Sequence, residues 1–542
     1  MLNRFARAPE KVDNQIISRE TESRNGEENI ASIPGEPKIW DCCILGGGMS
    51  GLTAAGCMVQ RGETNFCVIE ARSQVAGTWF DHDYPGAGTD TEVQSYAPTF
   101  KPIRSVHQYA TRDELLNYCI DLAGDIPQGQ LYLNTQILSA EFASEDGLWT
   151  VKTNNGEFLS RVVINCAIGS ISKNFVKDVG WPGRNKFEGQ VVHSSHLTKD
   201  TTIFENKKVA IVGLGATTIQ LAPSIMPRVS HLDVLHRTKP YILNCKRQKI
   251  SHNGIAYTLN RWFYEIRNVF FTMFDSRPGY EWILRYPLRW LNYRREDTPL
   301  LPPRDQPIHC TRRAFDYNGF KSLVEKENFQ LVDVSKSQIS FVKSGLCIDS
   351  RRMEYDVIVL AVGYDIGMAS FPIKVDNDTT ELTLSALHGG LGMFKELPNF
   401  FWPFVATGFP LFAIPPRLVE DSMARIIPLI QHLLRDGYRT VRPSEFLVST
   451  AEDARNKMMQ DLTANSVILA RGCNSYRYLN PVSFSYGSKP VYKRDSRFLQ
   501  SSGPTRLLAR VLAFIFLRPR FFDYSREVQT QCQADEKRAL VG

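Results

Sequence analysis

The sequence predicts an α/β protein with two Rossmann-like dinucleotide-binding domains and a helical insertion. Two glycine-rich loops carry this prediction, at 46–51 and 213–218, because each follows a short apolar strand and opens a helix. The length of 542 residues exceeds one simple domain and allows two or three. A content of 43% hydrophobic and 22% charged residues is ordinary for a globular protein with a large core.

The first loop belongs to a complete strand–helix–strand unit. Gly46 permits a tight turn, Gly48 lets the backbone approach a pyrophosphate, and Gly51 lets the helix pack close to the strand. Glu70 ends the second strand, where a carboxylate can accept hydrogen bonds from a ribose diol and disfavours a 2′-phosphate. We therefore expect FAD or NAD here, and not NADP. The expected strand, helix and second strand span 39–45, 52–61 and 65–70.

The second loop repeats the pattern with two differences. Gly213 and Gly215 keep their places, but Thr218 replaces the third glycine and should push helix and strand slightly apart. The following strand ends in Arg237, whose guanidinium can pair with a ribose 2′-phosphate; a solvated surface charge is the alternative. Two sites of opposite preference indicate FAD held at the first and NADPH bound at the second. The expected strands are 207–212 and 231–236, and the helix runs to 225.

Charge and cysteine usage argue against several function classes. A net charge of +7 over the whole chain is mild, so we expect no nucleic-acid partner. The eleven cysteines show neither a metal-ligand spacing nor a redox-active pair, which predicts no metal site and disfavours a disulfide reductase. No run of 18 apolar residues exists, so we expect no spanning helix, and we read the cysteines as reduced thiols of a cytoplasmic protein. Residues 506–520 are read as a core helix, with membrane contact as the less favoured alternative.

Between the two loops lies a third motif, formed by Phe187, Gly189 and His193. Together with the loops it resembles the fingerprint of class B flavoprotein monooxygenases, and within them the Baeyer–Villiger monooxygenases. That subclass usually carries Trp four residues after the His, where this chain has Leu197. Further segments resemble the family at 77–79, 84–90, 310–313, 328–333, 356–364, 397–401 and 473–476.

The resemblance implies a reaction. FAD reduced by NADPH reacts with O₂, and the resulting C4a-peroxyflavin inserts one oxygen atom next to the carbonyl of a ketone to give an ester or lactone. The substrate is expected to be a bulky specialised metabolite. Arg313 matches the active-site arginine, although a surface pair with Arg312 is the alternative, and Asp90 matches the acid that positions it as a buried partner.

The resemblance also implies cofactor contacts. Asp90 and Arg313 are counted among these cofactor contacts. An enzyme that oxygenates nitrogen or sulfur is the near alternative in function, because Gly88 stands where the family has Arg. A non-enzymatic flavoprotein is more distant. The flavin contacts are Gly77, Thr78, Trp79, Tyr96 and Ile137, and the NADP contacts are Ala216, Thr217, Thr218, Arg237, Thr238 and Arg312.

The domain boundaries follow from the motifs. A disordered tail (1–38) precedes the first part of the FAD-binding domain (39–180) and of the NADP-binding domain (187–240). A helical insertion (241–309) comes next. The second parts of the NADP-binding domain (310–390) and of the FAD-binding domain (391–500) follow, and then a C-terminal helical tail (501–542).

Overall fold

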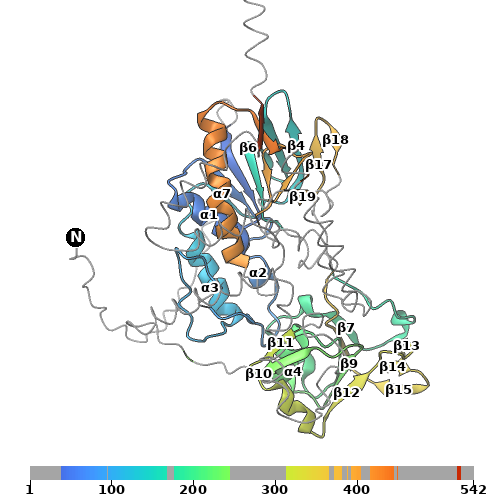
Figure 1. Cartoon of the computed structure of the whole chain (residues 1–542). Coiled ribbons are helices and arrows are strands. Elements are labelled where there is room, and N and C mark those ends of the chain that lie inside the picture. The colour runs from blue at the N-terminus through green and yellow to red at the C-terminus, as the bar shows by residue number, and fades with distance from the viewer. Residues whose placement is uncertain are drawn as a thin grey trace, which may run out of the picture. The chain divides into compact units, whose positions relative to one another are not determined.

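Two separate sheets carry the two glycine-rich loops (Figure 1). The described elements all belong to the unit Ile39–Gly542, and the expected tail lies outside them. The computed structural model describes residues 38–93, 96–167, 176–244, 313–364, 371–380, 392–403 and 415–444, together with 249, 387–388, 449 and 522–525.

The first predicted strand, β1 (Ile39–Leu45), lies inside a nine-stranded sheet. It pairs in parallel with β2 (Phe66–Ile69) on one side and with β6 (Gly156–Asn165) on the other. The order is β18-β17-β4-β5-β6-β1-β2-β3. The ninth strand, β21, pairs with residues 163–164 of β6, past the part of β6 that pairs with β5. The bounds are β3 Leu131–Tyr132, β4 Ile137–Ala143, β5 Leu148–Thr153, β17 Ile373–Val375, β18 Asp378–Thr379 and β21 Phe400–Phe401.

Both faces of this sheet are covered, which explains why β1 is apolar along nearly its whole length. Ile44 faces a core shared with α1 (Met49–Gln60) and α7 (Pro415–Arg435), which lie side by side (Figure 1). Leu45 faces an aromatic core that includes Trp149 and Phe400. Helix α7 thus anchors a late segment of the chain on the first domain.

The second loop follows β8 (Lys208–Val212) in a sheet of five parallel strands, ordered β12-β9-β8-β16-β7. The helix α4 (Ala216–Ile225) packs its apolar side chains against one face of that sheet. Both predicted nucleotide units therefore exist as strand–loop–helix–strand. The remaining strands are β7 Gln190–His193, β9 His231–His236, β12 Phe329–Asp333 and β16 Val357–Leu360.

Smaller elements complete the described residues. Helices α2 (Thr78–Asp81) and α3 (Arg112–Ala123) follow β2, and α3 begins with a capping box between Thr111 and Glu114. The 3₁₀ helices are Arg184–Lys186, Ser194–His196, Thr202–Phe204 and Phe320–Glu325. The small sheets join β13 Ile339–Val342, β14 Gly345–Ile348 and β15 Arg351–Glu354; β10 Tyr241–Asn244 and β11 Arg313–Asp316; β19 Leu387–His388 and β20 Met393–Phe394; β22 Thr440–Pro443 and β23 Phe522–Ser525.

Three expected boundaries are wrong. The NADP-binding part was expected to reach 390, but β17 pairs with β4 and so belongs to the first sheet. The helical insertion was expected from 241, but β10 is a strand that pairs with β11. The tail beyond 501 was expected to be helical, but β23 pairs with β22. In each case a partner strand distant in sequence supplies the backbone hydrogen bonds, and local patterns carry no sign of it.

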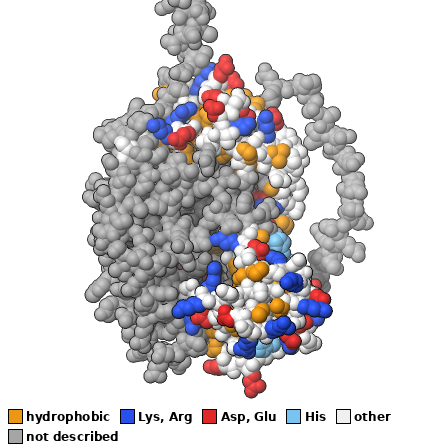
Figure 2. Space-filling model, turned by 90° about the vertical axis from the view of Figure 1, so that its right-hand side faces the viewer, with side chains coloured by type: hydrophobic (Ala, Val, Ile, Leu, Met, Phe, Trp, Pro, Cys, Tyr) orange, Lys and Arg blue, Asp and Glu red, His pale blue; other side chains and the backbone are white. Residues whose placement is uncertain are grey.

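The surface agrees with a modest net charge. Figure 2 shows Lys and Arg interspersed with Asp and Glu on the described part of one face, without a block of one sign there. Within the described ranges, no helix combines the length and the apolarity needed to cross a bilayer. The segment 506–520 lies outside those ranges, as does the Pro-rich stretch 299–307.

Candidate functional site

The first glycine loop is tight for a steric reason. Gly46 has φ +98°, and a Cβ at Gly51 would lie 1.8 Å from the carbonyl oxygen of Gly46. Helix α1 can therefore approach the end of β1 only with glycine at 51. Gly48 caps α1 in an extended conformation, and its own Cβ would meet nothing closer than 3.7 Å. A side chain at position 48 would thus make an ordinary van der Waals contact with the Gly77 backbone, next to the helix N-terminus at which a pyrophosphate is expected to bind.

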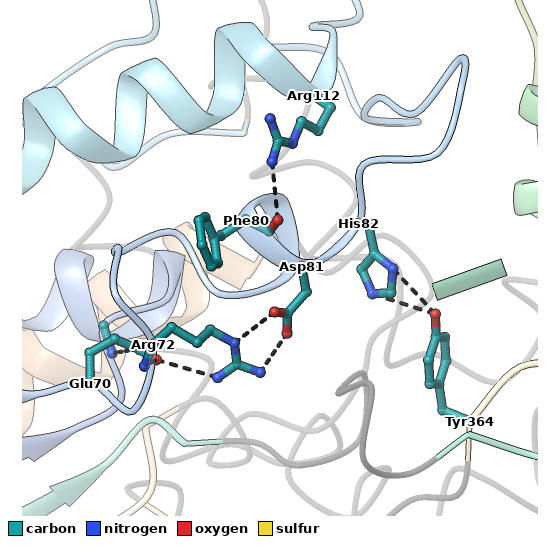
Figure 3. A network of polar contacts seen from close by, with 8 residues as sticks. Glu70, Arg72, Phe80, Asp81, His82, Arg112 and Tyr364 are labelled. Atoms are coloured by element: carbon teal, nitrogen blue, oxygen red, sulfur yellow. Dashed lines mark hydrogen bonds and ion pairs between the residues drawn. The ribbon is translucent and has the colours of Figure 1, made fainter. Parts of the chain in front are cut away.

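The Glu70 carboxylate holds the first glycine loop in place through hydrogen bonds. Its Oε2 accepts from the Gly47 N–H at 2.7 Å and its Oε1 from the Arg72 N–H at 2.9 Å, and the side chain is 3% exposed. The Arg72 guanidinium binds Asp81 through two hydrogen bonds and also reaches Glu70 (Figure 3). Two buried carboxylates share one cation, and the charge on Glu70 is thereby balanced.

The predicted flavin-side residues gather beside this loop. The Ala76 N–H donates to the Gly47 carbonyl at 3.0 Å, which brings the turn at Gly77 (φ +52°) against Gly48. Trp79 donates from Nε1 to the Tyr96 hydroxyl at 3.3 Å, and burial raises the pKa of Tyr96. Thr78 is the first residue of α2, and Ile137 is half-buried at the beginning of β4.

In the second loop, a buried threonine takes the place of the third glycine at the contact between helix and strand. Gly213 again has positive φ (+110°), and Gly215 caps α4 in an extended conformation. Thr218 is fully buried, and its hydroxyl donates to the Gly213 carbonyl at 2.7 Å. The corresponding place in the first loop has no room for any Cβ, whereas the second loop accommodates the Thr218 side chain there. The Thr218 hydroxyl fills the extra space and satisfies a loop carbonyl.

The predicted NADP residues lie at the carboxyl end of the second sheet. Arg237 and Thr238 follow β9 directly and are exposed, while Ala216 and Thr217 form the first turn of α4. An exposed guanidinium close to a helix N-terminus is suited to an anion. Arg312 lies outside the described residues.

A contact that the sequence did not suggest joins the segment 84–88 to helix α4. The Tyr84 hydroxyl donates to Gln220 Oε1 at 2.6 Å, and Gln220 Nε2 donates to the Gly88 carbonyl at 3.0 Å. Gly86 (φ +84°) packs so closely on α4 that a Cβ there would lie 2.3 Å from the Gln220 carbonyl. Burial raises the pKa of Tyr84, while a hydrogen bond with Thr217 opposes that shift. The segment after the flavin-side turn therefore docks on the NADP-side helix.

The central fingerprint forms a second connection. His193 ends β7, and its Nε2 lies 3.2 Å from the Gly363 carbonyl, which fixes the neutral Nε2–H tautomer. Its Nδ1 accepts from the Ser195 N–H at 3.2 Å, and burial lowers the pKa of His193. Tyr364 packs on the His193 ring at 5.4 Å and lies 3.3 Å from His82 Nδ1 (Figure 3).

The other fingerprint residues are structural. A Cβ at Gly189 would lie 2.4 Å from the Phe187 ring and 2.5 Å from the Asp356 carbonyl, and Phe187 packs on Phe341. Leu197, in the place of the family Trp, is 3% exposed in the core of the second sheet.

The expected pair of Asp90 and Arg313 is only partly described. Asp90 is exposed, so the expectation of a buried carboxylate is wrong; it lies in the turn just before Thr91, whose hydroxyl donates to it at 3.4 Å. The backbone of Arg313 begins β11, which pairs with β10. The Arg313 side chain lies outside the described residues.

Arg72, Gln220 and His82 are the residues that motif reasoning missed. Arg72 stands two positions after Glu70, and that proximity to a buried acid was the available signal. Gln220 and His82 make contacts with sequence separations of 132 and 282 residues, and no local pattern indicates such partners.

Comparison with known proteins agrees with this geometry. Residues 40–274 match the family model "Flavin-binding monooxygenase-like". The chain is 28% identical to a Baeyer–Villiger monooxygenase of Streptomyces coelicolor, over 84% of this chain and 90% of that protein. It is 25% identical to the putative FAD-containing monooxygenase MymA of Mycobacterium tuberculosis, over 75% of this chain and 85% of that one.

Solved structures show the same fold. A closed cyclohexanone monooxygenase superposes with a TM-score of 0.69 at 19% identity, covering 90% of this chain and 99% of that chain. The two-sheet architecture that carries the glycine loops in this chain is thus shared with that protein. In sequence the chain is thus similar to flavin-binding monooxygenases, among them proteins named Baeyer–Villiger monooxygenase, and it shares its fold with cyclohexanone monooxygenase.

Proposed function

We propose that this protein is an FAD-dependent, NADPH-consuming monooxygenase that converts a bulky ketone of specialised metabolism into an ester or lactone. The observation that carries the proposal is the pair of dinucleotide loops, which differ in charge at the second strand. Glu70 is a buried carboxylate at the first, and Arg237 is an exposed cation at the second. The relatives named above as Baeyer–Villiger and FAD-containing monooxygenases support the same reading.

The residues present fit both cofactors. The room beside Gly48, the steric need for Gly51 and the buried Glu70 suit the pyrophosphate and ribose of FAD. The N-terminus of α4 and Arg237 suit the phosphates of NADPH. When bound, the flavin supplies the hydride and O₂ chemistry that side chains cannot perform.

The protein's own residues position the two cofactors and exclude water from the site. The hydrogen bond between Tyr84 and Gln220 ties the flavin-side segment to α4 and so holds the two nucleotide loops in a fixed position relative to each other. His193 holds the end of β7 to the Gly363 carbonyl, so it acts on the geometry of the connection between the loops. We assign Arg313 the stabilisation of negative charge on the reacting oxygen atoms, and Asp90 the orientation of that guanidinium.

The test of this assignment separates chemistry from cofactor binding. Arg313→Ala should abolish ester formation while FAD content and NADPH-driven flavin reduction persist. Loss of flavin reduction as well would place Arg313 in the NADPH site only. Unchanged ester formation would remove it from the mechanism.

Oxygenation of nitrogen or sulfur is the second candidate, because Leu197 and Gly88 depart from the Baeyer–Villiger pattern. A panel of ketones, amines and thioethers, analysed by mass spectrometry of the products, distinguishes the two. Esters or lactones support the first proposal, and heteroatom oxides alone would replace it by the second.

A further inference from the structure

The strand registers identify which residues of the two nucleotide sites correspond. In the first sheet, Leu45 pairs with Ile69, and the Gly46 N–H donates to the Ile69 carbonyl at 2.8 Å. Glu70 is the next residue, so it stands one position beyond the last paired residue of the second strand.

The second sheet repeats this arrangement. Val212 pairs with Leu235, and the Gly213 N–H donates to the Leu235 carbonyl, again at 2.8 Å. The next residue is His236. The structural counterpart of Glu70 is therefore His236. The sequence pattern had indicated Arg237 as that counterpart, but Arg237 stands one position further along the chain.

His236 has an unsatisfied polar atom at this place. Like Glu70 it is 3% exposed, and its Nδ1 is buried without a hydrogen bond among the described residues. Glu70 meets the Gly47 N–H with one oxygen. A buried nitrogen without a partner is unfavourable, so a ligand group that supplies the partner gains binding free energy there.

The charges around His236 are mixed. Lys239 follows on its own segment, and Asp333 lies opposite His236 in the register with β12. Burial lowers the pKa of His236, Asp333 opposes that shift, and Lys239 adds to it. The ring is thus neutral near pH 7 in the free protein, and a dianionic phosphate beside it would favour its protonation.

We propose that His236 contacts the 2′-phosphorylated ribose of NADPH and, together with Arg237, determines the preference of this site for a 2′-phosphate. The inference rests on the proposed use of NADPH and adds the residue that reads the ribose. An imidazole in the place of Glu70 removes the charge that would repel a phosphate and offers a donor to it.

Two ligands that differ only in the 2′-phosphate test the inference without turnover. Adenosine 2′,5′-bisphosphate and 5′-AMP are titrated into the FAD-containing protein by calorimetry, with His236→Glu and His236→Gln as variants. His236→Glu should weaken the bisphosphate about tenfold or more and leave 5′-AMP nearly unchanged. An equal loss for both ligands would make His236 merely structural, and no loss would remove it from the site; either result overturns the inference.

The pH dependence gives an independent readout. As the pH rises from 6 to 8, the affinity of the wild-type protein for the bisphosphate should fall more steeply than the affinity of His236→Gln, because binding protonates the His236 ring. The phosphate titrates equally in both proteins and so cancels. Parallel curves would contradict a contact. A wild-type protein that does not prefer the bisphosphate would instead refute the proposed use of NADPH.

Discussion

Substituting Gly51 tests whether the first loop is built for close helix packing. The Cβ of Gly51→Ala would lie 1.8 Å from the Gly46 carbonyl oxygen, so α1 must move away from β1 by about an ångström. Overpacking of this kind lowers stability by about 1–3 kcal/mol, or roughly 2–10 °C in the melting temperature. The displaced helix N-terminus should also lose FAD, seen as a lower ratio of flavin to protein absorbance after purification.

The matched control is Gly48→Ala. Its backbone (φ −74°, ψ −179°) accepts any residue, and the new Cβ meets its nearest atom at 3.7 Å. The stability of the flavin-free protein should therefore be unchanged, whereas FAD content should fall because glycine at this position of such a loop lets the backbone approach the pyrophosphate. Wild-type melting temperature and FAD content in Gly51→Ala would refute this account of the loop.

Three further predictions concern the connections around the loops. Gln220→Leu removes the two hydrogen bonds that Gln220 makes with Tyr84 and Gly88; we expect a loss of about 1–2 kcal/mol in urea unfolding and slower flavin reduction by NADPH. Asp81→Asn leaves the Arg72 cation without its strongest partner and should lower stability by about 1–2 kcal/mol. The pKa of His193 is lowered by burial, so the unfolded chain binds more protons; the melting temperature should fall below about pH 6.5, less so in His193→Gln.

Each of these has a contradicting result. Asp113→Asn is the control for Asp81→Asn, since the Asp113–Lys199 pair is exposed and should contribute under about 1 kcal/mol. Equal losses of stability in the two variants would show that the buried network stabilises the protein no more than an exposed ion pair does. Gln220→Leu with wild-type reduction kinetics would mean that this contact does not align the loops. A pH profile identical in wild type and His193→Gln would exclude His193 as a source of the acid sensitivity.

The sequence sufficed for the local units and failed where distant strands or side chains decide. The strand, glycine loop and helix at 39–60 were predictable because turn sterics and apolar periodicity lie within one short segment. The placement of β17 and β23 was not, since their partners lie far away in the sequence.

The candidate site shows the same division. The roles of Gly46 and Gly51 followed from steric reasoning on a known turn, and the structure confirms their packing. The correspondence of Glu70 with His236 needed the strand register, because a sequence count cannot tell which residue lies directly past the last paired position. Solvent exposure of Asp90 likewise depends on tertiary packing.

Incubation of the purified protein with NADPH, a ketone panel and oxygen-18 gas is the decisive test of oxygen insertion beside a carbonyl. We expect an ester or lactone that carries one oxygen-18 atom for each NADPH consumed. NADPH oxidation with all oxygen recovered as hydrogen peroxide, across ketones of varied size, would contradict a monooxygenase that acts on carbonyl compounds.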